Sequence, residues 1–279
     1  MSKSIMNHDI LKAGVVGHPI AHSKSPLIHG YWLKKYGIAG SYERFDIAPN
    51  RLSEGVQELV QSGIRGFNVT IPHKVAVMDL CASLSEEAKK IGAVNTVVVG
   101  RDGELFGTNT DYFGFLENIK TAHPNFEFLG KKVVVLGSGG AARAIIFGLQ
   151  SANVSQITIV NRTYEKAEAL AREFSCEALP WDGLSSVLSD CDLLVNSTSL
   201  GMVGQDELVI DLSPLPSHAI VNDIVYSPLM TSLLRHAQDR GLSFVTGIGM
   251  LLHQARPGFE LWFGRPVDVD ADLQALVLA

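Results

Sequence analysis

The chain has 279 residues, of which 46% are hydrophobic, and carries a formal net charge of −6. This length and apolar content fit two domains of ordinary size, each with its own core. The acidic balance argues against a general nucleic-acid or anionic-membrane surface, so we expect small-molecule partners and local anion sites.

Three cysteines, Cys81, Cys176 and Cys191, lack the spacing of a metal site or a disulfide framework. No apolar run reaches the ~18 residues that span a bilayer. The N-terminal residues lack the apolar core of a signal peptide. We therefore expect a cytoplasmic protein with reduced thiols and no bound metal, and the sequence leaves open whether it is a monomer or a homodimer.

Hydrophobic periodicity over residues 1–110 predicts an α/β domain of its own. In chain order the expected elements are a strand at 13–17, a helix at 26–36 with Ser25 as N-cap, a strand at 41–47, a helix begun by Asn50 and closed by Gly63, a strand at 66–72, a helical stretch from Lys74 to about Cys81, and a hairpin at 93–99 and 104–108.

A helix at 111–122 is expected to carry the chain into a second domain, 111–247. Strands at 131–136, 157–160, 193–196, 219–224 and 243–246 alternate there with helices. This alternation predicts a Rossmann-type, doubly wound parallel sheet. The helical tail, about 248–279, could cap the second domain or return to the first, and substrate contacts on this helix would favour the return.

A glycine turn follows the first strand of this second domain, Gly137-Ser138-Gly139-Gly140-Ala141-Ala142. Gly137 allows a sharp turn, Gly139 lets a pyrophosphate approach the backbone, and Ala142 allows close helix packing. The free N–H groups at the start of the next helix favour phosphate. The turn therefore predicts a dinucleotide cofactor.

The end of the next strand selects between NAD and NADP. NAD sites usually place Asp or Glu there, on the ribose 2′-OH. This chain has Asn161-Arg162-Thr163, with Lys166 one turn later. Because Arg can pair with a 2′-phosphate, the sequence predicts NADP.

Polar side chains in the first domain stand where a simple fold does not need them, at 23–25, 68–74, 95–96 and 109–111. Together with the glycine turn, the 161–163 segment and Gly247–Gln254, they resemble the shikimate dehydrogenase family, in the same order from about Val15 to Gln254. The resemblance implies NADPH-dependent reduction of 3-dehydroshikimate to shikimate in aromatic amino-acid biosynthesis, in a cleft between a substrate domain and an NADP domain.

The resemblance also implies residue roles. Lys74 and Asp111 form the catalytic pair. The implied substrate contacts are Ser23, Ser25, Thr70, Lys74, Asn95, Asp111, Tyr226 and Gln254. The implied cofactor contacts are Glu86, Gly137, Ser138, Gly139, Gly140, Ala141, Asn161, Arg162, Thr163, Tyr164, Glu165, Lys166, Ile224 and Gly247.

The chemistry agrees with these roles. Hydride transfer to a ketone leaves negative charge on oxygen, and a lysine can both stabilise that charge and donate a proton. Asp111 can orient the ammonium, and the hydroxyls of Ser23 and Ser25 suit a substrate carboxylate. Simpler interpretations are an exposed helix-start lysine for Lys74 and a helix cap for Asp111.

Two other functions are compatible with the same residues. One is a quinate/shikimate dehydrogenase with relaxed cofactor choice, against which Arg162 argues. The other is an NADP-binding regulatory protein without turnover, against which the Lys74 and Asp111 pair argues.

Overall fold

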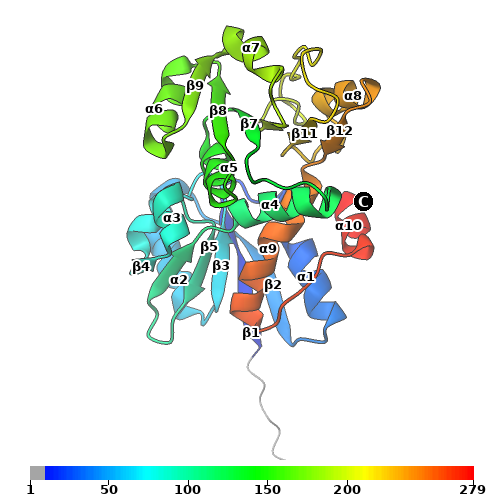
Figure 1. The fold of residues 1–279 in the computed structure, drawn as a ribbon. Coiled ribbons are helices and arrows are strands. Elements are labelled where there is room, and N and C mark those ends of the chain that lie inside the picture. The colour runs from blue at the N-terminus through cyan, green and yellow to red at the C-terminus, as the bar shows by residue number, and fades with distance from the viewer. Residues whose placement is uncertain (1–9) are drawn as a thin grey trace, which may run out of the picture. The chain divides into compact units, whose positions relative to one another are not determined.

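The computed structural model describes residues 10–279, which divide into two units (Figure 1). The first contains the chain up to Thr110 and then Ala255–Ala279, and the second contains Asp111–Gln254. The sequence predicts a second domain of 111–247. In the structure the division by contacts falls inside one helix, after Gln254.

A mixed sheet forms the centre of the first unit, in the order β2-β1-β3-β5-β6-β4. Its strands are β1 (Leu11–Gly17), β2 (Gly40–Asp46), β3 (Gly66–Val69), β4 (Ser83–Leu84), β5 (Thr96–Val99) and β6 (Leu105–Thr108). β1 pairs in parallel with β2 and β3, whereas β5 runs antiparallel to both β3 and β6. The carboxyl end of β3 and the amino end of β5 therefore lie at the same edge.

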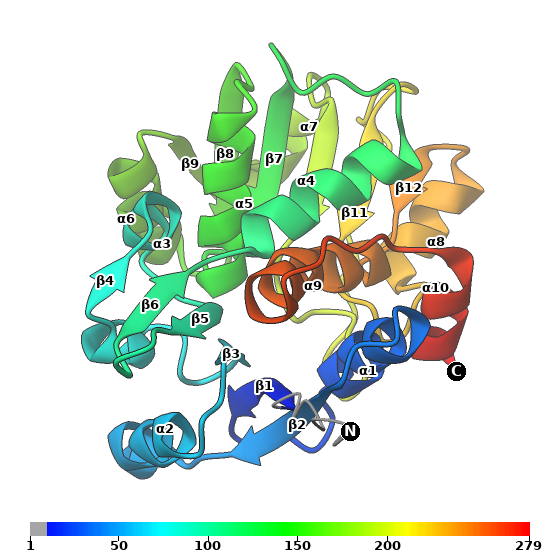
Figure 2. The ribbon, with the colours of Figure 1, turned by 90° about the horizontal axis from the view of Figure 1, so that it is seen from below.

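Both ends of the chain contribute helices to the first unit. These are α1 (Ser25–Lys35), α2 (Leu52–Gln61), α3 (Glu86–Ile91), the second half of α9 (Ile248–Phe263) and α10 (Ala271–Leu278). α10 lies beside α1 (Figure 2). The indole of Trp262 donates to the Val97 carbonyl at 2.9 Å, and that of Trp32 to the Asp268 carbonyl at 3.0 Å. The C-terminal segment is thereby fixed to the sheet and helices of this unit.

The second unit is a wholly parallel sheet, in the order β12-β11-β10-β7-β8-β9. Its strands are β7 (Lys132–Leu136), β8 (Gln156–Asn161), β9 (Glu177–Pro180), β10 (Leu193–Asn196), β11 (Ile220–Asp223) and β12 (Ser243–Val245). The strand order reverses between β7 and β10, which is the point where doubly wound sheets bind ligands. The predicted α/β fold class, with a Rossmann-type sheet, is confirmed.

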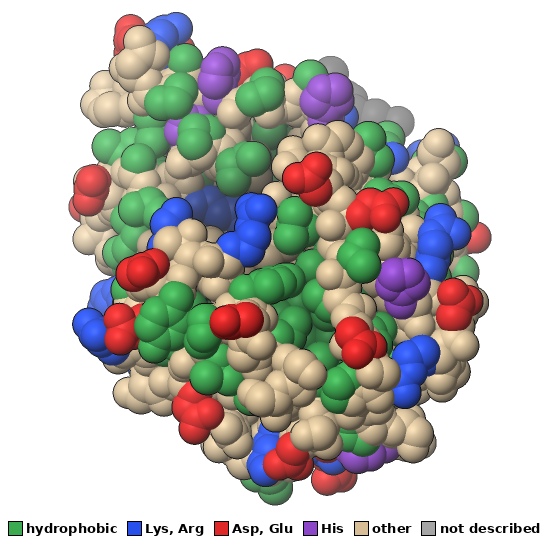
Figure 3. All heavy atoms as spheres, turned by 90° about the horizontal axis from the view of Figure 1, so that it is seen from above, with side chains coloured by type: hydrophobic (Ala, Val, Ile, Leu, Met, Phe, Trp, Pro, Cys, Tyr) green, Lys and Arg blue, Asp and Glu red, His purple; other side chains and the backbone are tan. Residues whose placement is uncertain are grey.

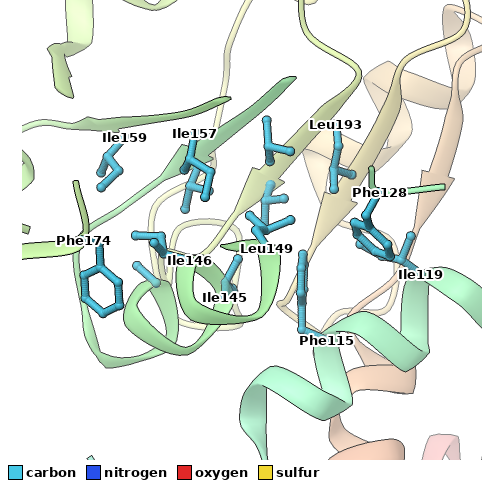
Figure 4. Close-up of a cluster of buried hydrophobic side chains, with 14 of the residues drawn as sticks. Phe115, Ile119, Phe128, Ile145, Ile146, Leu149, Ile157, Ile159, Phe174 and Leu193 are labelled. Carbon is cyan, nitrogen blue, oxygen red and sulfur yellow. The ribbon is translucent and has the colours of Figure 1, made fainter. Parts of the chain in front are cut away.

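Helices cover both faces of this sheet. They are α4 (Asp111–Ala122), α5 (Gly140–Ser151), α6 (Tyr164–Phe174), α7 (Leu184–Leu188) and α8 (Ser232–Asp239). Side chains from α4, α5 and α6 pack against strand residues such as Ile157 and Leu193 in one core (Figure 4). Leu188 of α7 and Leu233 of α8 belong to the core on the opposite face. Two apolar layers thus fix the strand ends from both sides.

Several local predictions were wrong. α1 has Lys24 rather than Ser25 at its N-cap, and Asn50 lies in a 3₁₀ turn (Pro49–Arg51) without capping α2. The helical stretch expected from Lys74 to about Cys81 does form, as a shorter 3₁₀ helix at Ala76–Leu80. α3, β4 and β9 were not predicted, and the tail forms two helices instead of one. These errors concern short elements or the ends of longer ones.

Basic and acidic side chains are interspersed on the face shown in Figure 3, as expected for a modest net charge of −6. Within residues 10–279, none of the helices has both the length and the apolar character needed to cross a membrane.

Candidate active site

Thr70, Lys74 and Asn95 meet at one edge of the first unit's sheet. Thr70 follows β3 directly, and its amide donates to the Val16 carbonyl at 2.9 Å. The Lys74 carbonyl accepts from the Val94 amide at 2.8 Å, one residue before Asn95. The Asn95 carbonyl in turn accepts from Val69 at 2.8 Å. The backbone thus brings together three of the predicted site residues from segments that are distant in sequence.

Ser23 and Ser25 lie at the start of α1. The Ser23 hydroxyl accepts from the Ser25 amide at 3.3 Å, and the Arg44 guanidinium donates to the Ser23 carbonyl at 2.6 Å. Ser23 therefore bonds to the first amide of α1, whereas the N-cap residue Lys24 makes no side-chain cap bond. A hydroxyl that accepts one bond can still donate its own proton, so both serines suit a carboxylate ligand.

A buried network of polar side chains supports Asn95. Its amide oxygen accepts from the Thr110 amide at 2.8 Å and from the Thr96 hydroxyl at 2.9 Å. Behind it, Asn68 donates to the Asn95 carbonyl and to the Thr96 hydroxyl, both at 3.1 Å. The Tyr42 hydroxyl donates to the Asn68 amide oxygen at 2.6 Å. Its amide nitrogen donates to the Thr110 hydroxyl at 3.1 Å, so both ends of the Asn95 side chain are held by this network.

Tyr42, Asn68 and Thr96 were not among the predicted site residues. Asn68 and Thr96 belong to the polar segments 68–74 and 95–96 that the sequence singles out, but no individual role was assigned to them; in the structure both are no more than 5% exposed. Tyr42 is one position of the alternating strand pattern at 41–47, so nothing in the local sequence distinguished it from an ordinary core residue.

Asp111 opens α4 in the second unit, directly after the Thr110 amide that Asn95 holds. One turn later, a Cβ built on Gly114 would lie 2.6 Å from the Met250 carbonyl and 2.7 Å from the Gln254 Cβ. Only glycine allows α4 to approach α9 this closely. Gln254 also belongs to the second unit, where its side-chain nitrogen donates to the Leu251 carbonyl at 3.0 Å.

The glycine turn lies at the carboxyl end of β7. Gly137 has a φ of +105°, and a Cβ there would lie 2.8 Å from both Ser197 Oγ and Thr198 Cγ2. At Gly139 and Gly140, by contrast, a Cβ would meet nothing within 4 Å. α5 starts here without a side-chain cap, so no capping side chain satisfies its first N–H groups. This arrangement fits a dinucleotide pyrophosphate, with Ser138 and Ala141 beside it.

The segment after β8 carries the basic residues that predict NADP. The side-chain nitrogen of Asn161 donates to the Thr163 carbonyl at 2.9 Å and so orders the segment. Arg162 and Lys166 are both exposed, as are Tyr164 and Glu165 at the start of α6. Over residues 10–279, no carboxylate forms an ion pair with Arg162 or Lys166. Both cations therefore fit a phosphate.

The remaining predicted cofactor residues separate into two places. A Cβ on Gly247 would overlap the Ile224 carbonyl oxygen and lie 2.6 Å from the Val225 oxygen, so these two segments touch. Tyr226 follows on the same segment, and burial raises the pKa of its hydroxyl. Glu86, however, lies on α3 in the first unit, exposed and paired with Lys89 at 2.7 Å. Its predicted cofactor role has no support in these contacts.

A parallel doubly wound sheet with an open glycine turn, joined to a second α/β unit with polar strand ends, defines an NADP-dependent oxidoreductase of two α/β domains. Three family models match this chain, and their descriptions agree with that class. They are "Shikimate dehydrogenase substrate binding domain" over residues 15–97, "Shikimate / quinate 5-dehydrogenase" over 120–224 and "Shikimate 5'-dehydrogenase C-terminal domain" over 247–277.

Curated and solved relatives cover nearly the whole chain. The shikimate dehydrogenase (NADP(+)) of Methylobacterium radiotolerans is 52% identical over 274 residues, 96% of each chain. Shikimate 5-dehydrogenase of Thermus thermophilus, solved with NADP(H) and shikimate, is 37% identical with a TM-score of 0.86 over 96% of this chain and 98% of that one. Quinate dehydrogenase of Corynebacterium glutamicum, in complex with NAD, is 30% identical with a TM-score of 0.89 over 96% and 99%. The chain belongs to the shikimate dehydrogenase family, as the sequence predicted.

Proposed function

We propose that the protein catalyses the reversible NADPH-dependent reduction of 3-dehydroshikimate to shikimate, a step of chorismate and aromatic amino-acid biosynthesis. The observation that carries the proposal is the meeting of Thr70, Lys74 and Asn95 at one sheet edge. Its location in a cleft between the substrate and NADP domains stays a prediction.

Lys74 is the proposed acid and base. Bound NADPH supplies the hydride. The Lys74 ammonium stabilises the negative charge that develops on the substrate carbonyl oxygen and transfers its proton to that oxygen. In the reverse direction the neutral amine removes the proton from the hydroxyl. Asp111 is the proposed partner that orients the ammonium and accepts a bond from a neighbouring substrate hydroxyl.

The other substrate contacts follow from the side chains available. Ser23 and Ser25 would donate to the carboxylate, and Thr70, Asn95 and Gln254 would bind the ring hydroxyls. Tyr226 would close the site from the segment after β11. A site with this many short polar side chains selects its substrate because a missing hydroxyl leaves protein groups unpaired.

Quinate is the alternative substrate to be tested, because a quinate dehydrogenase is among the similar structures, at a TM-score of 0.89. Steady-state kinetics with shikimate and quinate, each with NADP and NAD, distinguish the two functions. We expect the highest kcat/KM with shikimate and NADP. A preference for quinate with NAD would contradict the proposal, and binding of both ligands without turnover would favour the regulatory function.

The Lys74→Ala variant tests the assigned chemistry. We expect kcat to fall about 10²- to 10⁴-fold, the usual contribution of a general acid, while the Kd of NADPH stays within about twofold of the parent value. Lys90→Ala removes an exposed lysine of α3 in the same unit and serves as the matched control. A comparable loss of NADPH binding in Lys74→Ala would show that its role is misassigned.

A cytoplasmic location and a monomeric or homodimeric state remain part of the proposal. Size-exclusion chromatography with light scattering tests the latter directly.

A further inference from the structure

A carboxylate without a cationic partner is buried at the end of β11. Asp223 is 0% exposed, and within residues 10–279 no lysine, arginine or histidine forms an ion pair with it. Burial raises the pKa of this carboxyl, although bonds from Thr231, Val225 and Asn196 act in the opposite direction. A buried charge of this kind is costly unless the bonds that it makes serve a purpose.

The bonds of Asp223 connect three separate segments. Oδ1 accepts from the Asn196 side chain at 2.9 Å and from the Val225 amide at 3.0 Å. Oδ2 accepts from the Thr231 hydroxyl at 2.7 Å, at the N-cap of α8. One side chain therefore joins the end of β10, the segment after β11 and the start of α8.

The network continues from Asn196 to the glycine turn. The Asn196 amide oxygen accepts from the Thr198 amide at 3.0 Å and from its hydroxyl at 2.7 Å. Thr198 and Ser197 in turn border Gly137, where a Cβ would lie 2.8 Å from each. The Ser197 hydroxyl also donates to the Leu136 carbonyl at 2.6 Å. The segment after β10 is thus held against the turn that would receive the pyrophosphate.

Both segments lie on the cofactor side of the sheet. In a parallel sheet the carboxyl ends of β7, β10 and β11 share one edge, and ligands bind where the strand order reverses, between β7 and β10. The segment after β11 contains Ile224 and Tyr226, which are predicted cofactor and substrate contacts. We propose that Asp223 is a positioning residue for NADP binding, which holds the segments 197–200 and 224–226 in the arrangement that the cofactor requires. This inference rests on the proposed function.

The consequence of removing Asp223 follows from the population of that arrangement. If only a tenth of the molecules retain it, the apparent Kd of NADPH rises about tenfold. Asp223→Asn keeps an amide oxygen that can accept from Asn196 and Val225, and the Thr231 hydroxyl can reverse its role and accept from the new NH₂ group. The isosteric variant should therefore restore most of the affinity.

The experiment compares Asp223→Ala, Asp223→Asn and Thr231→Val with a matched control, Asp192→Ala. Asp192 lies at the opposite end of β10, where its carboxylate accepts from the Lys132 amide at 2.9 Å and from Lys131 at 3.1 Å. NADPH binding is measured by nucleotide fluorescence, well below the melting temperature of each variant. Amide hydrogen exchange of the ligand-free proteins reports the two segments directly.

We expect Asp223→Ala to raise the Kd of NADPH at least about tenfold and to speed exchange at 197–200 and 224–226. Thr231→Val should raise the Kd about threefold, and it remains informative if the alanine variant does not fold. Asp223→Asn and Asp192→Ala should stay within about threefold of the parent. A folded Asp223→Ala or Thr231→Val protein with parental affinity and exchange would overturn the inference, as would an equal effect of Asp192→Ala. So would an Asp223→Asn protein as weak as Asp223→Ala.

The failure of the proposed function gives a different result. In that case the unmodified protein does not oxidise shikimate with saturating NADP. The binding and exchange measurements on the variants do not depend on that turnover.

Discussion

Removal of the Tyr42 hydroxyl tests the buried network beneath the predicted substrate residues. The Tyr42→Phe variant keeps the ring, which stacks on His29 with 3.9 Å between ring centroids and 3° between planes. It removes the 2.6 Å bond to Asn68 and leaves a buried amide oxygen without that donor. An unsatisfied buried acceptor costs about 1–3 kcal/mol. We therefore expect the free energy of unfolding to fall by about this amount.

Urea denaturation measures this loss. Two of the three tryptophans, Trp32 and Trp262, belong to the first unit, and the Trp262 ring lies 6.0 Å from the Tyr42 ring, whereas Trp181 belongs to the second unit. Fluorescence is therefore recorded in a Trp181→Phe background, where it reports the unit in which the change is made. Tyr36→Phe is the control, because the Tyr36 ring contacts the Lys35 and Arg265 cations without a bond from its hydroxyl among the described residues. Its free energy of unfolding should change by less than about 0.5 kcal/mol.

The kinetic consequence is smaller. Asn68 bonds to the Asn95 carbonyl and to Thr96, so the loss of Tyr42 should loosen Asn95 and raise the KM of shikimate a few-fold, with the Kd of NADPH unchanged. A Tyr42→Phe protein as stable as the Tyr36→Phe control would refute the reasoning, because the network would then contribute nothing to folding.

Two further predictions concern a surface cation and a surface carboxylate. Arg162→Ala should reduce the ratio of kcat/KM with NADPH to kcat/KM with NADH about 10- to 100-fold, since a bond between charged groups contributes about 1.5–3 kcal/mol. The control is Arg172→Ala, on α6 and paired with Glu168, which should leave this ratio unchanged. An unaltered ratio in Arg162→Ala would contradict the assignment. A hydrogen bond from Lys35 lowers the pKa of Asp270 to about 2, below its value of about 3.9 in an unfolded chain, so the stabilisation is present above about pH 4 and is lost as the pH falls towards 2. Asp270→Ala should therefore lower the free energy of unfolding by about 1 kcal/mol at pH 6, because it removes both the ion pair with Lys35 and the cap of α10. The difference between variant and parent in thermal unfolding should shrink near pH 2.5. A difference that is constant with pH would argue against the ion pair.

The second unit was more predictable from sequence than the first. Four of its strands, β7, β8, β10 and β11, are apolar runs that end at or just before Gly, Asn or Asp. Its glycine turn has a local meaning that does not depend on distant residues. Arg162 could be interpreted for the same reason, because it follows a strand end directly. The alternation of β7, β8, β10, β11 and β12 with helices along the chain also predicted a parallel sheet, and these strands form one.

The first unit depended on contacts that no local pattern records. Tyr42 and Asn68 are 26 residues apart, and Asn68 and Asn95 are 27 apart, so the network becomes visible only when the strands have paired. The cap expected at Asn50 failed because Pro49 begins a 3₁₀ turn there. The helix expected after Lys74 is short for a similar reason: the Lys74 carbonyl bonds to Val94 across the sheet edge. Tertiary pairing outweighed local propensity at each of these positions.

The division of the chain has a consequence for how the protein is made. Residues 111–254 form one unit that is inserted into the other, and the first unit includes Ala255–Ala279. The ring of His29 packs against Phe259 and Trp262, which are synthesised more than two hundred residues later. On the ribosome the inserted unit can therefore fold while the apolar surface of residues 10–110 is still incomplete. That surface must remain protected from aggregation until the last segment emerges, so shortening the C-terminus should damage the unit that begins the chain.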